Sequence, residues 1–511
     1  MLESCSVCAG GDLRLLDIRP SFSNFNFVED NFGDVPSIRR LFSQARTLKA
    51  RTLIIERIKP TGTVSMENDA IRGRHPNYKM TGLTRLSFWK KRIKDQSDVH
   101  KVPSESLVAY AILKRDTIPD KINQWHIFES VVRKYPHRNN CVPTARLFHV
   151  RIVGKVFKIQ GVLHCQQNGL NKACAQVAIR TIHNIYFGKD ISYNQINELA
   201  SKSQRFNPGI GLSARQIRTV LKRLGFKFNP VDYNVAEKIN AGFREKRPYQ
   251  KFLYAGLESG VGALLGFQFS SDQPLHLIPV FGHTFNCDAW VPTADHNYFH
   301  IGEETQYVSS EAWLTSFICH DDTFGSNFCI PRFYVSQSNV KFIASFRPQG
   351  TACDAVQAEA IASHYLYSML PQLPSTENRW LRRLKQYSGE QRLVLRAICV
   401  KRDEYLYHLN EMRDWKNRPE HNFITGALAF LLPEILWMVE ISAPEIFPAN
   451  LRKLGEIVLD ATKSSKANLR LNSFKMARFP EVYFFFEKTE NPQTIPSNLL
   501  SHTPVFRYRA E

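Results

Sequence analysis

The spacing of hydrophobic and polar residues is most regular in the middle third of the chain. Apolar side chains recur at helical spacing over 173–187, which predicts an amphipathic helix that ends at Gly188. Capping-box patterns that begin at Ser192 and Ser213 predict two further helices. Apolar runs that we expect to be strands follow at 262–269, 276–282 and 317–322. Helices followed by strands are typical of an α+β domain.

The regions before and after this segment have mixed patterns. Before it, we expect strands at 52–58 and 106–113, and a hairpin of 148–153 and 156–162 that turns at Gly154-Lys155. After it, residues 357–370 and 378–408 have helical patterns, and the chain ends with an apolar run at 482–487 and a polar tail.

A chain of 511 residues is long enough for about three domains. We therefore expect a mixed α/β module over 1–160, a central α+β domain over 161–345 and a second α/β module over 346–511.

The composition is that of a folded protein with a bias toward anionic partners. Hydrophobic residues make up 43% of the chain, which excludes wholesale disorder. Lys and Arg number 67 against 47 Asp and Glu, a formal net charge of +20. This charge is spread over the whole chain, so it predicts at most weak contact with nucleic acid. Basic runs beside aromatic residues at 88–94 and 379–385 suit either such contact or a solvated face with a buried Trp.

The sequence favours a cytoplasmic location without a membrane span. Residues 1–16 have no secretory pattern. The most apolar stretch, 424–441, is interrupted by Pro433, Glu434 and Glu440, whose carboxylates would be costly in a bilayer. Ten scattered cysteines do not form a disulfide framework. Cys5 and Cys8 have the spacing of half a zinc site, but no second pair follows, and we expect neither a metal nor a cofactor.

One cysteine is placed for nucleophilic chemistry. A helix N-terminus stabilises a thiolate through its dipole and free N–H groups, and Cys174 lies where the 173–187 helix begins. Gln166 and Gln167 lie upstream and can supply an amide donor to an oxyanion. A histidine must accept the thiol proton, and the strand that begins at His276 offers one.

The run Gln167-Asn-Gly-Leu-Asn-Lys-Ala-Cys174-Ala-Gln-Val-Ala resembles the start of papain-like cysteine peptidases, above all the bacterial branch that cleaves double-glycine leader peptides. Further likenesses follow in the family's order: Ser192, Gly211-Leu-Ser213, Leu224-Gly225, Glu258-Ser-Gly260 and His276, which precedes Gly282. The resemblance covers about 160 residues, and the order of the motifs is more specific than any one of them. It implies a papain-like fold of helices and an antiparallel sheet, with Cys174 as nucleophile, His276 as base and Gln167 as oxyanion donor.

The resemblance also implies an Asp or Asn that orients the histidine. Asp321 is the first candidate and Asp322 the second, because both follow the apolar stretch 313–318. The interval from His276 is longer than in compact peptidases and requires an insertion around 290–313. Without that insertion, Asp288 or Asp295 would lie nearer in the sequence.

Two other roles have alternatives. Gln167 lies one residue farther from Cys174 than is usual in the family, so Gln166 or Asn168 is an alternative oxyanion donor. His283, which follows Gly282, is an alternative base.

The sequence thus predicts a thiol peptidase that cleaves a peptide or isopeptide bond in a protein or peptide substrate. One alternative is another acyl transfer on the same fold, such as deamidation or transglutamination. The other is a non-catalytic protein that binds nucleic acid or another protein.

Overall fold

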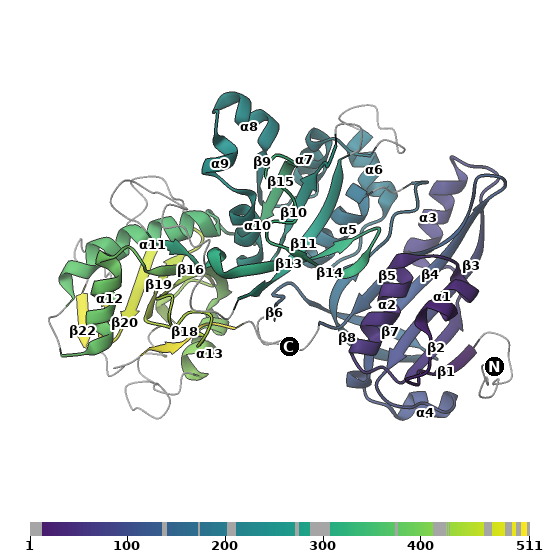
Figure 1. Cartoon of the computed structure of the whole chain (residues 1–511), viewed down its shortest axis with the longest axis horizontal. Helices are drawn as coiled ribbons and strands as arrows, with labels where there is room; N and C mark the ends of the chain where they lie inside the picture. The colour runs from purple at the N-terminus through teal and green to yellow at the C-terminus, as the bar shows by residue number, and fades with distance from the viewer. Residues whose placement is uncertain are drawn as a thin grey trace.

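The computed structural model contains three large sheets, antiparallel except for the pairing of the first two strands of the third, arranged along the long axis of the molecule (Figure 1). It describes residues 13–134, 140–171, 174–201, 211–270, 275–286, 307–373, 377–411, 426, 428, 430–463, 473–485, 493–496 and 502–507. Within these residues, each large sheet has seven strands, and a two-stranded pair accompanies the last. Helices pack on the sheets, so the fold is α+β.

The first sheet has the strand order β1-β2-β3-β4-β5-β8-β7. Its strands are β1 (Leu13–Asp17), β2 (Thr52–Arg57), β3 (Lys79–Trp89), β4 (Leu107–Ile118), β5 (Ile122–Val132), β7 (Arg146–Ile152) and β8 (Lys155–His164). Its helices are α1 (Asn24–Phe32), α2 (Pro36–Thr47), α3 (Gly62–Arg72), α4 (Gln96–Lys101) and the 3-10 turn η1 (Ser104–Ser106). The β7–β8 hairpin turns at Val153 and Gly154, both at positive φ, one residue earlier than expected.

Helix α2 packs on the first sheet through its apolar stripe. Ile38, Leu41, Phe42 and Ala45 recur at helical spacing and are buried against strands β2 to β5. A neighbouring face of the helix carries Ser37, Arg40 and Gln44, whose side chains hydrogen-bond residues of the middle of the chain. α2 therefore has a second contact surface besides its own sheet.

The middle sheet has the order β14-β13-β11-β10-β15-β9, with the short β6 paired to β11. Its strands are β6 (Asn140–Cys141), β9 (Phe228–Asp232), β10 (Ala263–Phe267), β11 (His276–Phe285), β13 (Leu314–Asp321), β14 (Gly325–Pro331) and β15 (Val340–Phe346). Its helices are α5 (Cys174–Phe187), α6 (Tyr193–Ser201), α7 (Ala214–Arg223), α8 (Tyr233–Ile239), α9 (Phe243–Lys246), α10 (Tyr249–Glu258) and η2 (Ser310–Trp313). The capping box at Ser213 and Gln216 is formed as expected.

Helix α5 lies between the first two sheets. It contacts β8 of the first sheet and β11 of the middle sheet, and Ala178, Ile179 and Ile182 are completely buried there. One continuous apolar cluster includes these residues together with side chains of both sheets. The first two lobes therefore share a core.

The third sheet has the order β12-β16-β17-β19-β20-β21-β22. Its strands are β12 (Val308–Ser309), β16 (Val394–Lys401), β17 (Ile435–Ser442), β19 (Gly455–Asp460), β20 (Phe474–Phe479), β21 (Val482–Phe485) and β22 (Gln493–Pro496). β18 (Arg452–Lys453) pairs with β23 (Thr503–Pro504). The helices are α11 (Ala355–Met369), η3 (Leu370–Gln372), α12 (Arg379–Gly389) and α13 (Arg402–Glu411).

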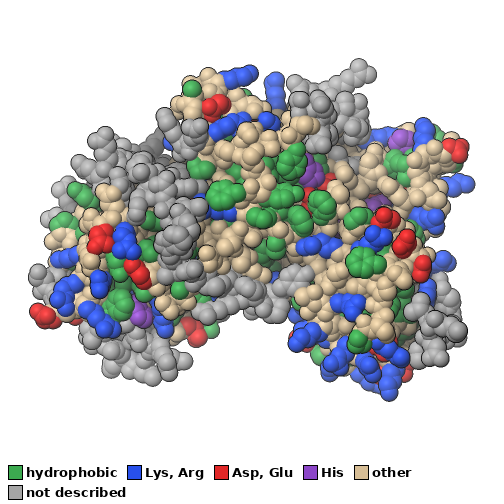
Figure 2. All heavy atoms as spheres, in the orientation of Figure 1, with side chains coloured by type: hydrophobic (Ala, Val, Ile, Leu, Met, Phe, Trp, Pro, Cys, Tyr) green, Lys and Arg blue, Asp and Glu red, His purple; other side chains and the backbone are tan. Residues whose placement is uncertain are grey.

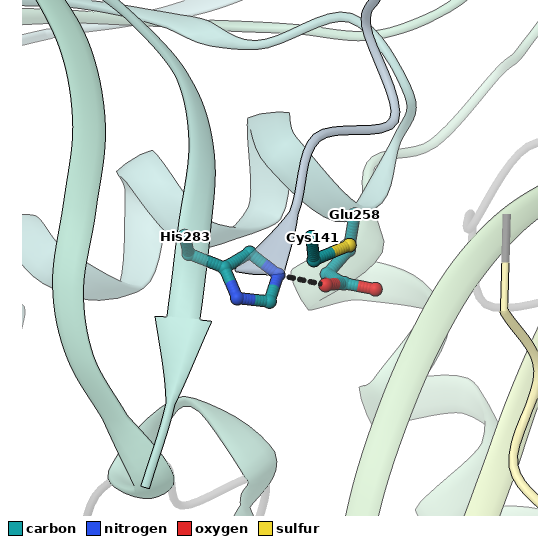
Figure 3. Close-up of side chains that lie close together, drawn as sticks. All are labelled: Cys141, Glu258 and His283. Atoms are coloured by element: carbon teal, nitrogen blue, oxygen red, sulfur yellow. Dashed lines mark hydrogen bonds and ion pairs between the residues drawn. The ribbon is translucent and has the colours of Figure 1, made fainter. Parts of the chain in front are cut away.

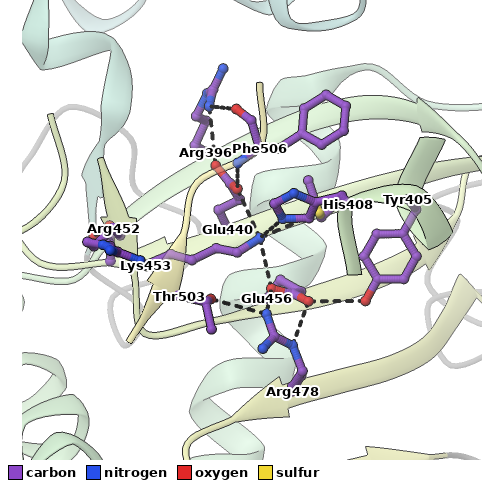
Figure 4. A network of polar contacts seen from close by, with 12 residues as sticks. Arg396, Tyr405, His408, Glu440, Arg452, Lys453, Glu456, Arg478, Thr503 and Phe506 are labelled. Atoms are coloured by element: carbon purple, nitrogen blue, oxygen red, sulfur yellow. Dashed lines mark hydrogen bonds and ion pairs between the residues drawn. The ribbon is translucent and has the colours of Figure 1, made fainter. Parts of the chain in front are cut away.

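A row of buried charges crosses this third sheet (Figure 4). Arg396, Glu440, Glu456 and Arg478 occupy directly opposed positions on four neighbouring strands. Lys453 lies between the two glutamates, 3.0 Å from Glu440 and 2.9 Å from Glu456. Each charge in this buried row therefore has an oppositely charged partner.

The backbone of Phe506 completes the charge row. Its N–H donates to Glu440 at 2.6 Å, and its carbonyl accepts from Arg396 at 3.2 Å. Segment 502–507 therefore closes the polar network from outside the sheet.

The prediction of one long helix over 378–408 is wrong over 394–401, whereas 379–389 and 402–408 are helical. α12 ends at Gly389, and Val394–Lys401 forms β16, a strand that is buried along most of its length between β12 and β17. Its continuous apolar run fits a buried strand as well as a helix, and periodicity alone does not separate the two.

The apolar segment 424–441 ends in strand β17 rather than in a helix. Among the residues that the structure describes, no helix combines the length and apolar character needed to cross a membrane.

Candidate active site

Cys174 is the first residue of helix α5 and is half-buried. Its Sγ lies 3.5 Å from the carbonyl oxygen of Leu275, the residue before β11. The packing of α5 on β11 thus brings the helix N-terminus to the start of the strand that carries His276. The first turn of a helix has N–H groups without intrahelical partners, which favour an anion close to the helix N-terminus.

His276 begins β11 and is in contact with both the thiol and a carboxylate. Its Nε2 lies 3.0 Å from Asp321 Oδ2, and the ring also hydrogen-bonds the Cys174 side chain. Phe267, directly opposite on β10, packs edge-on against the imidazole with the ring centroids 5.3 Å apart. The imidazole is therefore held between two polar partners and one aromatic wall.

Asp321 ends β13 and is fixed by the turn that follows it. Its Oδ1 accepts the backbone N–H groups of Thr323 and Phe324, both at 2.8 Å, which leaves Oδ2 for His276. Such Asx geometry is a local property of Asp at a turn. The same side chain thus shapes the β13–β14 hairpin and orients the histidine.

These contacts shift the pKa values of both partners. Burial disfavours the imidazolium, but the hydrogen bonds to Asp321 and Cys174 and the charge of Asp322 outweigh it and raise the pKa of His276 to about 10. Burial also opposes the Asp321 carboxylate, but the bonds from His276 and from the turn N–H groups lower its pKa below the usual value. The pair is an imidazolium and a carboxylate at neutral pH.

Asp322 has a different environment from Asp321. Its Oδ1 lies 3.6 Å from His276 Nε2, beyond hydrogen-bond distance. Burial raises its pKa to about 6, although the nearby His276 charge favours ionisation. Of the two candidate acids, Asp321 makes the bond and Asp322 adds charge nearby.

The three candidate oxyanion donors differ in how their side chains are held. The Gln166 oxygen accepts from Ser37 Oγ at 2.8 Å and from the Ile127 N–H at 3.0 Å. Asn168 is buried, donates to Glu67 and Asn171, and accepts from the loop backbone. Gln167 lies exposed between them. Its amide is therefore the most accessible of the three.

His283 lies in a separate cluster at the other end of β11. Figure 3 shows His283, Glu258 and Cys141 side by side. His283 Nε2 lies 2.5 Å from Glu258 Oε1, and Arg396 donates to the other oxygen of Glu258 at 3.0 Å. The structure thus brings His276 to Cys174 and holds His283 in an ion-pair network between the second and third lobes.

No local pattern in the sequence indicates this second cluster. Cys141 reaches His283 only because β6 pairs with β11 across 142 positions of the chain. Burial raises the pKa of the Cys141 thiol to about 12, with the Glu258 charge adding to the effect.

Three groups of side chains within the described residues have donor atoms close enough to share a metal ion: Cys141, Glu258 and His283; Glu67, Asp116 and His126; and His276, Asp321 and Asp322. The second already encloses Lys114, whose Nζ lies 2.8 Å from Glu67 and 3.1 Å from Asp116. In the first, Arg396 balances Glu258. These internal cations neutralise the carboxylates that a metal would need.

Exposed aromatic side chains surround the site. Phe269 and Tyr334 are in contact, Phe324 stacks on Phe328, and Phe267 joins Phe269 to the His276 ring. Figure 2 shows hydrophobic side chains gathered on the face of the middle lobe. These side chains make the surface next to His276 and Asp321 partly apolar.

The basic run after β3 is not an aromatic-stacking surface. Phe88 and Trp89 are completely buried, while Lys90, Lys91 and Arg92 are exposed. Stacking on bases needs an accessible ring. This run therefore offers charge alone.

The alternative acids Asp288 and Asp295 lie outside the described residues, as do Cys5 and Cys8. Comparison with protein-family models, with curated proteins and with solved structures finds no match for this chain.

Proposed function

We propose that this protein is a thiol-dependent peptidase with a papain-like catalytic domain and a Cys174, His276 and Asp321 triad. The observation that carries the proposal is the continuous polar chain from a cysteine at a helix N-terminus through one imidazole to a fixed carboxylate. A nucleophile, a base and a group that orients the base are the three parts that acyl transfer needs.

The reaction follows from these positions. His276 holds the thiol proton as an imidazolium, and the Cys174 sulfur attacks the substrate carbonyl as a thiolate to form a tetrahedral adduct. The carbonyl oxygen becomes negative and is held by the Cys174 N–H and the Gln167 amide. When the adduct collapses, the C–N bond breaks and His276 returns the proton to the leaving amine. Water, deprotonated by His276, then hydrolyses the thioester and frees the thiol.

Asp321 acts on His276 rather than on the substrate. Its carboxylate accepts from Nε2, which leaves Nδ1 as the ring nitrogen for the thiol. It also stabilises the imidazolium that persists until the leaving group departs.

The proposal is tested with the purified full chain and a matched Cys174→Ala variant. Each is incubated with a denatured proteome, and new N-termini are labelled and sequenced by mass spectrometry. We expect new termini only with the unmodified chain. Mass gains of about one dalton without cleavage, or cross-links, would instead show another acyl transfer at the same cysteine. Equal products from both proteins would refute a role for Cys174.

A further inference from the structure

We infer that helix α2 of the N-terminal lobe is part of the catalytic apparatus, because Arg40, Gln44 and Ser37 position both the Asp321 hairpin and the Gln166–Gln167 loop. The inference rests on the proposed function and assigns to the first lobe a role in the reaction of the second.

The hairpin contact consists of four hydrogen bonds from two side chains. Arg40 donates to the carbonyl oxygens of Ser326 at 2.8 Å and Asn327 at 2.6 Å. Gln44 donates to the Ser326 carbonyl at 2.6 Å and accepts from the Ser326 hydroxyl at 2.8 Å. The Arg40 guanidinium also lies 5.2 Å from the centre of the Phe328 ring. Helix α2 is therefore hydrogen-bonded to the first residues of β14.

These hydrogen bonds lie next to the residue that pairs with Asp321, the proposed catalytic acid. Asp321 pairs with Gly325 across the hairpin, and the pairing is irregular between Cys319 and Asp321. Gly325 has a φ of +107°, and a Cβ there would lie 3.2 Å from both Arg40 Cδ and the Ser37 Cα. The helix thus lies against the backbone that faces Asp321, at the point where the ladder alone specifies the geometry least.

The hairpin is otherwise supported by few elements. Among the strands that the structure describes, β14 is at the edge of the middle sheet and pairs with β13 alone. His320 adds a bond from the Asn327 N–H at 3.0 Å. α2 consequently supplies the outer support that a neighbouring strand would give elsewhere.

The same helix reaches the oxyanion loop. Ser37 Oγ donates to the Gln166 side-chain oxygen at 2.8 Å, and Ser37 is almost completely buried. That oxygen also accepts the Ile127 N–H of β5, so Gln166 is fixed entirely by the first lobe. The contacts of Gln166 with α2 and β5 therefore also determine the position of the next residue, Gln167. Helix α2 therefore contacts both the hairpin that carries Asp321 and the loop that carries the proposed oxyanion donor Gln167.

The experiment compares Arg40→Met with Arg39→Met. Met fills similar space without donating hydrogen bonds. Arg39 lies on the same helix but pairs with Asp34 and Glu29 of its own lobe, so its variant is the matched control. Arg40→Lys, which keeps one donor, is the conservative variant.

The experiment measures the charge of His276 through the rate at which Cys174 is alkylated. Iodoacetate is anionic and is attracted by an imidazolium, whereas iodoacetamide is neutral. The ratio of their rates, resolved for Cys174 by peptide mapping, therefore falls as His276 loses its proton. Within the described residues, the titratable groups in contact with this ring are Cys174, Asp321 and Asp322. Cooperative unfolding is measured in parallel.

In Arg40→Met, we expect the pH at which the iodoacetate-to-iodoacetamide rate ratio has fallen by half to move by about one unit or more toward neutral. This is the size of shift that a weakened hydrogen bond to a charged group produces. Arg39→Met should match the unmodified chain and Arg40→Lys should lie between them. If Arg40→Met does not fold, Gln44→Met is measured in its place with the same expectation. Identical profiles for the Arg40 or Gln44 variant and the unmodified chain would overturn the inference alone. Failure of Cys174 to react selectively in the unmodified chain would overturn the proposed function.

Discussion

Strand β11 carries two histidines in two clusters of the same composition. His276, at its start, meets Cys174 and Asp321, whereas His283, near its end, meets Cys141 and Glu258. Both clusters therefore contain a thiol, an imidazole and a carboxylate.

Their surroundings are different. Cys174 is the first residue of a 14-residue helix and lies beside a half-buried imidazole. His283 and Glu258 are completely buried, and Arg396 already balances the carboxylate. The cluster proposed as catalytic therefore differs from the buried one in its helix N-terminus, its exposure and a carboxylate that no arginine balances, although the residue types are the same.

The largest expected difference between the clusters is thiol reactivity. We expect iodoacetamide at pH 7 to modify Cys174 roughly 10³-fold faster than Cys141, because the buried Cys141 thiol with its pKa of about 12 has little thiolate. Peptide mapping after short exposure measures both rates. Cys174→Ser should remove the fast site and Cys141→Ser should leave it unchanged; comparable rates at the two cysteines would erase the distinction.

The next effect is the loss of the Asp321 carboxylate. Asp321→Asn should reduce cleavage by about 10²-fold or more, since a carboxamide orients the imidazole but does not stabilise its charge. It should also lower the pKa of His276 from about 10.

The sign of the pH effect on stability follows from that raised value. In the unmodified chain, the stabilisation from this pair is fully present below the ordinary histidine pKa near 6.5 and is lost as pH rises through about 10. In Asp321→Asn, the free energy of unfolding should not show this decrease between pH 6.5 and about 10. Denaturant unfolding at pH 6, 8 and 10.5 measures it, and parallel curves for the two proteins would contradict the assigned pair.

The third prediction concerns stability at the other cluster. Arg396→Met should lower the free energy of unfolding by about 3 kcal/mol, because it leaves Glu258 and Glu440 buried with one cation fewer. Urea titration monitored by circular dichroism measures this. The alkylation rate of Cys174 should change little under native conditions, and a large decrease would show that the two clusters are coupled through β11.

The smallest effect is expected for Asp322→Asn. A carboxyl whose pKa is raised by burial contributes stability that is present below pH 3.8 and lost as pH rises through about 6. The variant should therefore be more stable than the unmodified chain above pH 7 and equal to it near pH 4. Thermal unfolding of both proteins above pH 7 and near pH 4 measures this difference. A variant that is more stable than the unmodified chain only at pH 4 would contradict the raised pKa of Asp322.

Local patterns in the sequence were enough to predict the helix that begins at Cys174, the capping box at Ser213 and the strand at His276. Each depends on neighbours within a few residues, such as helical spacing or a Ser paired with a Gln three positions later. The order of these motifs also singled out Cys174, His276 and Asp321, which the structure brings into contact.

The contacts between distant segments could not be predicted in this way. Arg40 reaches Ser326 across 286 positions, and Cys141 reaches His283 through strand pairing. Neither contact leaves a spacing in the sequence. The apolar run at 394–401 was assigned to a helix because its burial on both sides removes the alternation that marks a strand.

The buried charge row of the third sheet has a consequence for synthesis on the ribosome. Glu440 and Arg396 obtain two of their partners from the backbone of Phe506. Until that residue has left the exit tunnel, the strands already made must carry these charges incompletely paired. We therefore expect the third lobe to complete its folding only after its last strands emerge, later than the two lobes that precede it.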